Sequence, residues 1–460
     1  MQPVLTRDEM RAADAAALAR VSHATLVGRA GTAVAHAALR MMGGAYGKQV
    51  VVIAGKGSNG ADGLVAAAYL ESRGARVTVI GATEAPAALP SCDLVIDGAY
   101  GTGFHGAYDA PHAPPGTPVL AIDVPSGLDA DTGAVSGAAT RATRTVTFAA
   151  RKPGLLQGDG PTHCGTVEVA DIGIEAGASR AALMEDGDIA ALVPARPRVS
   201  NKWTTALGVA AGSVGMEGSA ILCTRGALAT GAGMIRLGSP GDPAGGWPVE
   251  AVRMRLPASG WATSFTAATE KCKAIVVGPG LGTGDGTKQE IRAVVAAATV
   301  PLVLDADGIT ALGHVTSARD LLSRRTAPTV LTPHDGEYAR LAGAPPGEDR
   351  LAAARHLADQ LDVIVLLKGP LTAVAAPGGA WPDVLLSAAG VPALATAGTG
   401  DVLSGVIGAL LARGVPAQAA AALGAHLHGR AAAAGRSEGL VAGDLPDLIA
   451  AQLNERRAHG

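Results

Sequence analysis

The 460-residue sequence is poor in aromatic residues and in cysteine. Phe, Trp and Tyr make up 3% of the chain against a hydrophobic content of 48%, so its cores must be built from Ala, Val, Leu and Ile. The four cysteines (Cys92, Cys164, Cys223 and Cys272) are far apart and form no Cys-x-x-Cys pair. This usage argues against a zinc site and favours a reduced, cytoplasmic protein with ordinary thiols.

Excess charge and long hydrophobic runs are missing too. The formal net charge is −3, which leaves no basic surface for nucleic acid. No apolar stretch is long enough to cross a bilayer. The first twenty residues include the charged Arg7, Asp8, Glu9, Arg11 and Asp14, a pattern that does not fit a signal peptide. We therefore expect neither a nucleic-acid partner nor a membrane.

The length predicts two domains, because one hydrophobic core rarely serves so long a chain. Short β-rich runs alternate with helical patterns and Gly-rich loops in both halves, which predicts parallel sheets covered by helices. We expect one α/β domain over residues 1–175, a linker over 176–200 and a second α/β domain over 201–460. The expected strands are 49–54, 76–80, 93–97, 119–124, 143–148 and 166–169 in the first domain, and 206–211, 234–237, 274–277, 302–305, 329–331 and 363–367 in the second.

In the first half, polar residues follow three of the expected strands. The segment 55–63, Gly-Lys-Gly-Ser-Asn-Gly-Ala-Asp-Gly, combines close backbone approach with a helix N-terminus, which suits a phosphate. Asp97 ends the third strand, and Asp123 ends the fourth, just before Ser126. With Asn59 these residues offer oxygen ligands at one rim of a sheet, an arrangement that suits a hard cation.

These motifs resemble the NAD(P)H-hydrate epimerase domain over roughly residues 1–175, most specifically in Asp-Val-Pro-Ser-Gly-Leu-Asp-Ala-Asp-Thr-Gly at 123–133. The resemblance implies a Rossmann-like αβα sandwich, with Asn59, Asp97 and Ser126 holding K⁺ and Asp123 transferring the proton during epimerisation. It implies that the hydrated nucleotide contacts Ser58, Asn59, Gly60, Ala61, Asp62, Gly101, Thr102, Gly103, Phe104, His105, Gly106, Ala107 and Asp123. Ser58 and Ala61 depart from the family's usual Asn and Gly, and Ala61 would be unfavourable if its φ had to be positive.

The second half carries the most informative short stretch of the chain, Thr-Ala-Gly-Thr-Gly-Asp at 396–401, which leads into an apolar helical pattern. Small residues, a helix N-terminus and a carboxylate coincide there, so phosphate can bind beside a group that accepts a proton from a hydroxyl. Further polar loops follow expected strands at 278–282, 305–308, 331–337 and 367–372. All of them belong to one rim of the sheet.

Together these segments resemble the ADP-dependent NAD(P)H-hydrate dehydratase domain, which has a ribokinase-like αβα fold, over about residues 200–455. The resemblance implies that the hydrate contacts Ala220, Gly280, His334 and Asp401. It implies that the adenine nucleotide contacts Lys368, Gly369, Pro370, Leu371, Thr372 and Gly400. Asp401 would be the general base as the hydrate's hydroxyl attacks the terminal phosphoryl group of ADP, with Mg²⁺ bridging the nucleotide phosphates.

The sequence therefore predicts a bifunctional repair enzyme that acts on hydrated NADH and NADPH (NADHX and NADPHX) with ADP as co-substrate. Two alternatives stay open. One is a ribokinase-like small-molecule kinase, and the other makes the N-terminal domain a non-catalytic nucleotide-binding or scaffolding module. We also expect a homo-oligomer, although the Ala-rich helices that could form its face could equally be core.

Overall fold

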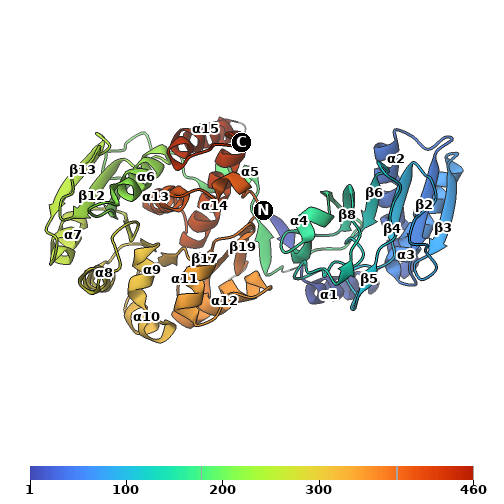
Figure 1. Ribbon diagram of the computed structural model, residues 1–460, viewed down its shortest axis with the longest axis horizontal. Coiled ribbons are helices and arrows are strands. Elements are labelled where there is room, and N and C mark those ends of the chain that lie inside the picture. The colour runs from blue at the N-terminus through green and yellow to red at the C-terminus, as the bar shows by residue number, and fades with distance from the viewer. Residues whose placement is uncertain (178, 380–381, 459–460) are drawn as a thin grey trace. The chain divides into compact units, whose positions relative to one another are not determined.

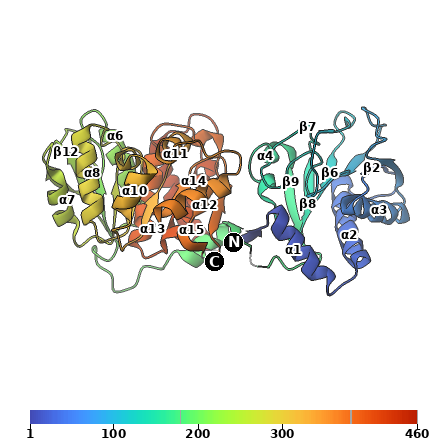
Figure 2. The same cartoon turned by 90° about the horizontal axis from the view of Figure 1, so that it is seen from below.

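The computed structural model describes residues 1–177, 179–379 and 382–458. The chain divides into two compact units, residues 2–180 and residues 181–460 (Figures 1 and 2). The segment 176–200, predicted as a linker, contains strand β10 (Ala181–Leu183) and helix α5 (Asp186–Leu192), and both belong to the second unit. Residue 178 of that segment lies outside the described residues.

The N-terminal unit contains a parallel sheet in the order β3-β2-β4-β6-β8-β9. Its strands are β2 (Gln49–Ala54), β3 (Arg76–Gly81), β4 (Leu94–Gly98), β6 (Val119–Ile122), β8 (Arg144–Phe148) and β9 (Thr166–Ala170). The other elements are β1 (Gln2–Val4), α1 (Arg7–Leu18), α2 (His23–Met42), α3 (Ser58–Ser72), β5 (Tyr108–Asp109), β7 (Gly137–Ala138) and α4 (Gly160–His163).

Alternating side chains bury both faces of the central strands. Val50 and Val52 of β2 belong to the core formed with α2 and α3, whereas Val51 and Ile53 face a second cluster that includes Tyr108. Helix α1 begins at a capping box in which Thr6 accepts from the Glu9 amide and Glu9 accepts from Thr6. These elements aim the ends of β2, β4 and β6 at one rim of the sheet.

In the C-terminal unit the strands run β10-β19-β18-β17-β16-β15-β14-β11-β12-β13, and among the described residues β18 alone is antiparallel to both of its neighbours. The strands not yet given are β11 (Ala206–Ala210), β12 (Met234–Pro240), β13 (Ala251–Leu256), β14 (Ala274–Val277), β15 (Leu302–Leu304), β16 (Thr329–Leu331), β17 (Ile364–Leu367), β18 (Thr372–Ala375) and β19 (Val384–Ser387). The longer helices are α6 (Glu217–Ala229), α7 (Trp261–Thr269), α8 (Asp285–Ala297), α9 (Asp307–Leu312), α10 (Val315–Leu322), α11 (Asp335–Ala342), α12 (Arg350–Leu361), α13 (Thr399–Ala412), α14 (Ala417–Ala434) and α15 (Leu445–Ala458).

The helices of this unit form two layers. Helices α6, α13, α14 and α15 pack together with the sheet in one large core, and α7 to α12 form the other layer. Small residues bring α13 very close to α6, since an ideal Cβ on Gly405 would lie 2.0 Å from the carbonyl oxygen of Cys223. This contact fixes α13, whose N-terminus lies at the rim where the polar loops emerge. The predicted α/β fold class is confirmed in both units.

Candidate active sites

A cavity of about 180 Å³ lies at the carboxyl ends of the strands in the N-terminal unit. Its polar lining combines predicted residues with others: Asp14, His23, Ser58, Asn59, Asp62, Thr102, Asp123 and Lys152. Apolar side chains from α1, α2 and the ends of the sheet complete the wall. The structure thus brings five of the predicted epimerase residues to one cavity.

Asp123 sits at the centre of a buried polar cluster. Its Oδ1 accepts hydrogen bonds from Thr147 Oγ1 at 3.0 Å, from the Phe148 amide at 3.3 Å and from Lys152 Nζ. The backbone of Asp123 has a φ of 66°, a strained value for a residue other than glycine. Lys152 is fully buried, and its Nζ also donates to Thr147 Oγ1 and the Phe148 carbonyl. These hydrogen bonds fix Asp123 Oδ1, and the carboxylate lies on the wall of the cavity.

The cavity also contains two further carboxyl groups and only one lysine. Asp62 is 4% exposed, and burial, together with the negative charge of Asp123, raises its pKa to about 7. Burial and Asp123 likewise raise the pKa of Asp14, while Lys152 opposes the shift. The cavity can therefore hold a protonated and an ionised carboxyl group together near neutral pH.

The predicted cation ligands lie close together next to this cavity, which Asn59 also lines. Asp97 is fully buried and accepts from Ser126 Oγ at 2.7 Å and from the Ser126 amide at 2.9 Å. Asn59 Nδ2 donates to the carbonyls of Tyr100 and Ile122, and Ser126 Oγ contacts the Tyr100 carbonyl at 3.2 Å. Burial raises the pKa of Asp97, and hydrogen bonds from Ser126, Thr140 and Ala99 oppose this shift. Within the described part of the chain no ion pair to Asp97 is found. Oxygen atoms around an unpaired buried carboxylate fit a hard monovalent cation.

The loop at residues 101–107 divides between two surroundings. Thr102 lines the cavity, whereas the ring of Phe104 packs against Tyr100 and Tyr108 and His105 contacts Arg7 Nη1. Neither Phe104 nor His105 lines the cavity. Gly101 approaches the side chain of Asn59, and Gly106 has a φ of 113°, while Gly103 and Ala107 complete the loop.

Gly60 and Ala61 lie in the first turn of α3. A Cβ on Gly60 would come within 1.9 Å of the Gly55 carbonyl oxygen, so only glycine fits there. Ala61 is absent from the residues with positive φ, so its departure from glycine costs no backbone strain.

The C-terminal unit has a larger cavity, about 660 Å³, within the size range of small-molecule sites. It is lined by predicted nucleotide contacts and their neighbours: His334, Asp335, Lys368, Gly369, Pro370, Thr372, Gly390, Val391, Pro392, Leu394, Ala395, Thr399, Gly400, Leu403 and His428. Leu371 is 1% exposed and does not line the cavity, so its side chain serves the core.

Asp401 lies in the first turn of α13, after the αL residue Gly398 that begins the helix. The first-turn amides of a helix have no intrahelical acceptor and are free for an anion. Burial is the largest influence on the carboxyl group and, with the charges of Asp305 and Asp307, raises its pKa to about 6. A hydrogen bond from Ser219 and the charge of Lys368 oppose this shift.

Ser219 also links Asp401 to the other predicted hydrate contacts. An ideal Cβ on Gly280 would lie 2.8 Å from the Ser219 side chain, and Gly280 has a φ of 63°. Ala220 follows Ser219 on α6, but its side chain is fully buried in the core. The structure therefore places Gly280 and Asp401 around Ser219, while Ala220 can contribute only through its backbone.

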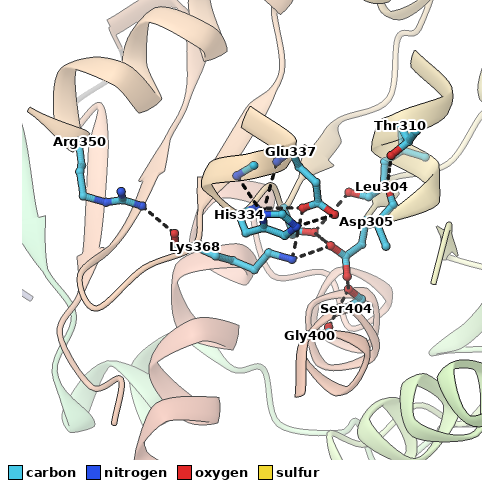
Figure 3. A network of polar contacts seen from close by, with 12 residues as sticks. Leu304, Asp305, Thr310, His334, Glu337, Arg350, Lys368, Gly400 and Ser404 are labelled. Carbon is cyan, nitrogen blue, oxygen red and sulfur yellow. Dashed lines mark hydrogen bonds and ion pairs between the residues drawn. The ribbon is translucent and has the colours of Figure 1, made fainter. Parts of the chain in front are cut away.

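Lys368 lies within a network of polar contacts at the rim of the sheet (Figure 3). Its Nζ is 2.8 Å from Asp305 Oδ1 and 3.8 Å from Glu337 Oε2. Glu337 accepts from the His334 amide at 3.0 Å, and His334 Nδ1 accepts from the Gly336 amide at 3.0 Å. His334 therefore caps α11, and with its side chain 56% exposed it also faces the cavity.

Lys152 was not predicted from the sequence, and Asp305 had no predicted role. Lys152 follows β8, the sheet neighbour of β6, so the strand-end reasoning that selected Asp123 could have selected it as well. Asp305 follows β15 and was recognised only as a strand end. Its partners are scattered along the chain, and their convergence is not visible as a motif.

Comparison with known proteins assigns both units. Residues 207–455 match the NAD(P)H-hydrate dehydratase family, and residues 23–88 and 81–154 match the family of YjeF-related protein N-termini. A solved ribokinase-like superfamily protein from Enterococcus faecalis V583 has 22% sequence identity and a TM-score of 0.52, and covers 60% of this chain and 96% of its own. That similarity supports the ribokinase-like fold of the second unit. The class is therefore a YjeF-related domain followed by an NAD(P)H-hydrate dehydratase domain.

Full-length relatives identify the particular family. A protein of Mycobacterium tuberculosis H37Rv named bifunctional NAD(P)H-hydrate repair enzyme Nnr is 39% identical, with 90% of each chain covered. A protein of the same name from Salinibacter ruber is 36% identical over 100% of this chain and 97% of its own. The chain belongs to the family of bifunctional NAD(P)H-hydrate repair enzymes, and the resemblance inferred from its motifs is confirmed.

Proposed function

We propose that the chain repairs hydrated NADH and NADPH in two steps. The N-terminal unit interconverts the R and S hydrates, and the C-terminal unit dehydrates the S form with ADP, giving NAD(P)H, AMP and phosphate. The observation that carries the proposal is that each unit brings an aspartate to the rim of its sheet: the buried Asp123 beside Lys152, and the half-buried Asp401 beside the α13 amides. Family membership supports the same pair of activities.

In the epimerase unit, Asp123 is the proposed proton-transfer group. Lys152 and Thr147 fix its Oδ1, so the free oxygen is the one available to substrate. Asp62, Asn59, Ser58 and Thr102 line the same cavity and would orient the hydrated ring. K⁺ would be held by Asn59, Asp97 and Ser126, where it would compensate the buried charge of Asp97 and fix the loop that carries Thr102.

In the dehydratase unit, Asp401 would take the proton of the hydrate's hydroxyl as that oxygen bonds to the terminal phosphorus of ADP. The bond between that phosphorus and the bridging oxygen breaks, and AMP leaves. The amides of Thr399, Gly400 and Asp401 would stabilise the charge that develops on the phosphoryl group. Loss of phosphate from the ring carbon, together with loss of a proton from the neighbouring ring carbon, would then restore the double bond of NAD(P)H. The phosphorylation step serves the reaction because phosphate leaves a carbon far more easily than hydroxide does.

The charges around Lys368 support a requirement for Mg²⁺. Lys368 is already paired with Asp305 and lies near Glu337, so it cannot by itself neutralise the phosphates of a nucleotide. Among the described residues no group of three metal-ligating His, Cys, Asp or Glu side chains is present. We therefore expect Mg²⁺ to be held mainly by the nucleotide phosphates, as is common for this ion.

The alternatives fit less well. A small-molecule kinase would release a phosphorylated product, whereas the second unit belongs to a dehydratase family. A non-catalytic N-terminal module would have no need for a strained aspartate fixed by a fully buried lysine in a cavity.

None of the helices in the described part of the chain has the length and apolar character that a membrane span requires.

The experiment that tests the proposal follows NADH absorbance in the near-ultraviolet from a mixed R/S NADH hydrate preparation with Mg²⁺ and K⁺. ADP, ATP and no nucleotide are compared. We expect complete recovery that depends on ADP. Absence of recovery with either nucleotide, together with phosphorylation of another hydroxylated compound, would favour the kinase instead.

A further inference from the structure

We propose that Asp305 is a positioning residue that couples the nucleotide-binding Lys368 to the helix that carries Asp401. The inference rests on the proposed dehydratase function and adds to it how two catalytic elements from distant parts of the chain are kept in register. Asp305 follows β15 and is 2% exposed, and both oxygens of its carboxylate accept hydrogen bonds from other side chains, so it acts through these neighbours.

The two oxygens of the Asp305 carboxylate serve two different elements. Oδ1 accepts from Lys368 Nζ at 2.8 Å and from Thr332 Oγ1 at 2.7 Å, at the ends of β17 and β16. Oδ2 accepts from Ser404 Oγ at 2.6 Å. Figure 3 shows the carboxylate between the lysine and the α13 helix. A single rigid group therefore connects the lysine to α13.

Ser404 transmits this connection to the first turn of α13. It lies one turn after Gly400 and Asp401, and its hydroxyl is also 3.0 Å from the Gly400 carbonyl oxygen. An ideal Cβ on Gly400 would be 3.7 Å from Lys368 Nζ and 3.9 Å from Asp305 Oδ2, so this turn passes close to both charged groups. A shift of Ser404 would thus move the anion-binding amides and Asp401 relative to Lys368.

Stability alone does not account for this arrangement. A buried ion pair loses as much in desolvation as it gains in attraction, and an apolar group of the same size often stabilises a core better. Here the ion pair of Lys368 and Asp305 connects the lysine to the N-terminal part of α13 at the rim of the sheet. Both the lysine and that helix N-terminus are expected to bind phosphate. Such fixed second contacts keep catalytic groups within the narrow tolerances that phosphoryl transfer needs.

Two substitutions test the coupling, because each removes one hydroxyl that donates to the same carboxylate. Ser404→Ala breaks the link to α13, whereas the matched control Thr332→Val keeps it. For Ser404→Ala we expect kcat to fall about 10–100-fold, the effect of losing a hydrogen bond to a charged group, while KM for ADP changes less than about 3-fold. Thr332→Val should stay within about 3-fold of the unsubstituted protein in both constants.

Hydrogen exchange gives a readout that does not require turnover. The peptide spanning residues 396–406 should exchange faster in Ser404→Ala than in Thr332→Val, with and without ADP. Equal exchange and equal kcat in the two variants would overturn the coupling. If the unsubstituted protein binds ADP but converts no hydrate, the proposed function fails, and the exchange comparison still decides the role of Asp305. Asp305→Asn, which keeps the shape, should reproduce the faster exchange and also raise KM for ADP.

Discussion

Lys152 donates a hydrogen bond to Asp123 from an ammonium group that is completely buried. The two residues belong to the segments after neighbouring strands β6 and β8, and they meet at the wall of the N-terminal cavity. A lysine without access to water needs such a partner, and the contact fixes one oxygen of the carboxylate. The pair therefore sets the position of the group that we propose for proton transfer.

Replacing Lys152 by Met should disturb this arrangement. Without the lysine, Asp123 Oδ1 loses the charged group that fixes it, so we expect epimerase activity to fall by about 10²-fold or more. Interconversion of R and S hydrates, followed by chromatography, measures the effect. Lys48→Met is the matched control, because Lys48 pairs with Asp93 on the surface at 3.2 Å. Epimerisation as fast in Lys152→Met as in Lys48→Met would rule out the role.

Asp401→Asn should lower dehydratase turnover by about 10²–10⁴-fold with little effect on the fold. The amide keeps the shape of the carboxyl group but cannot accept the hydroxyl proton. Asp285→Asn offers a control, since Asp285 also lies in the first turn of a helix, α8, and is 94% exposed. Steady-state kinetics on the S hydrate distinguish the two, and near-normal turnover in Asp401→Asn would remove the general-base assignment.

The dehydratase rate should fall on the acid side of pH 6. Burial raises the pKa of Asp401 to about 6, and a general base must be unprotonated to act. Activity is therefore expected to be level above this pKa and to decline about tenfold per pH unit well below it. A profile of kcat/KM against pH measures this acidic decline. The residual activity of Asp401→Asn should not show it. A profile flat down to pH 4 would contradict the prediction.

Potassium should matter only to the first reaction. The oxygen cluster of Asn59, Asp97 and Ser126 lies in the N-terminal unit, so replacing K⁺ by tetramethylammonium should slow epimerisation and leave dehydration of the S form unchanged. Ser126→Ala should remove the response to K⁺. Epimerase rates in matched buffers provide the test, and equal rates in the two salts would show that no cation is needed there.

The close contact of α6 and α13 predicts a large effect of a single methyl group. Gly405→Ala would place a Cβ 2.0 Å from the Cys223 carbonyl oxygen, so the helices must separate. We expect the unfolding free energy to drop by about 1–3 kcal/mol and dehydratase activity to fall with it. Gly286→Ala, also helical but with open space around it, should be neutral or slightly stabilising. Denaturant unfolding of both variants measures the difference.

The buried parallel strands were predictable because they are short apolar runs that end in polar residues. Expected and observed bounds coincide at β2, β14 and β16. The antiparallel pair β18 and β19 was missed, since four-residue strands in a Gly- and Pro-containing segment lack a distinct pattern. Strand β13 was missed as well, because its arginines interrupt the apolar run.

The candidate site residues were predictable from the sequence, but their partners were not. Asp123 follows a strand and Asp401 begins a helix, and both stand in local motifs. The contact of Ser404 with Asp305 spans 99 residues, and no spacing in the sequence indicates it. The burial of the Leu371 and Ala220 side chains was not predictable either, because a sequence motif does not show which of its side chains point into the core.

Mixing two single-site variants tests the central claim, that one chain carries two separate sites acting in sequence. With R/S NADH hydrate, ADP, Mg²⁺ and K⁺, Asp123→Asn alone should restore NADH absorbance only to the level of the S fraction. Asp401→Asn alone should restore almost none while still interconverting the hydrates. The mixture should restore the absorbance completely. Complete recovery by Asp123→Asn alone, or a mixture that still stops at the S fraction, would contradict the account.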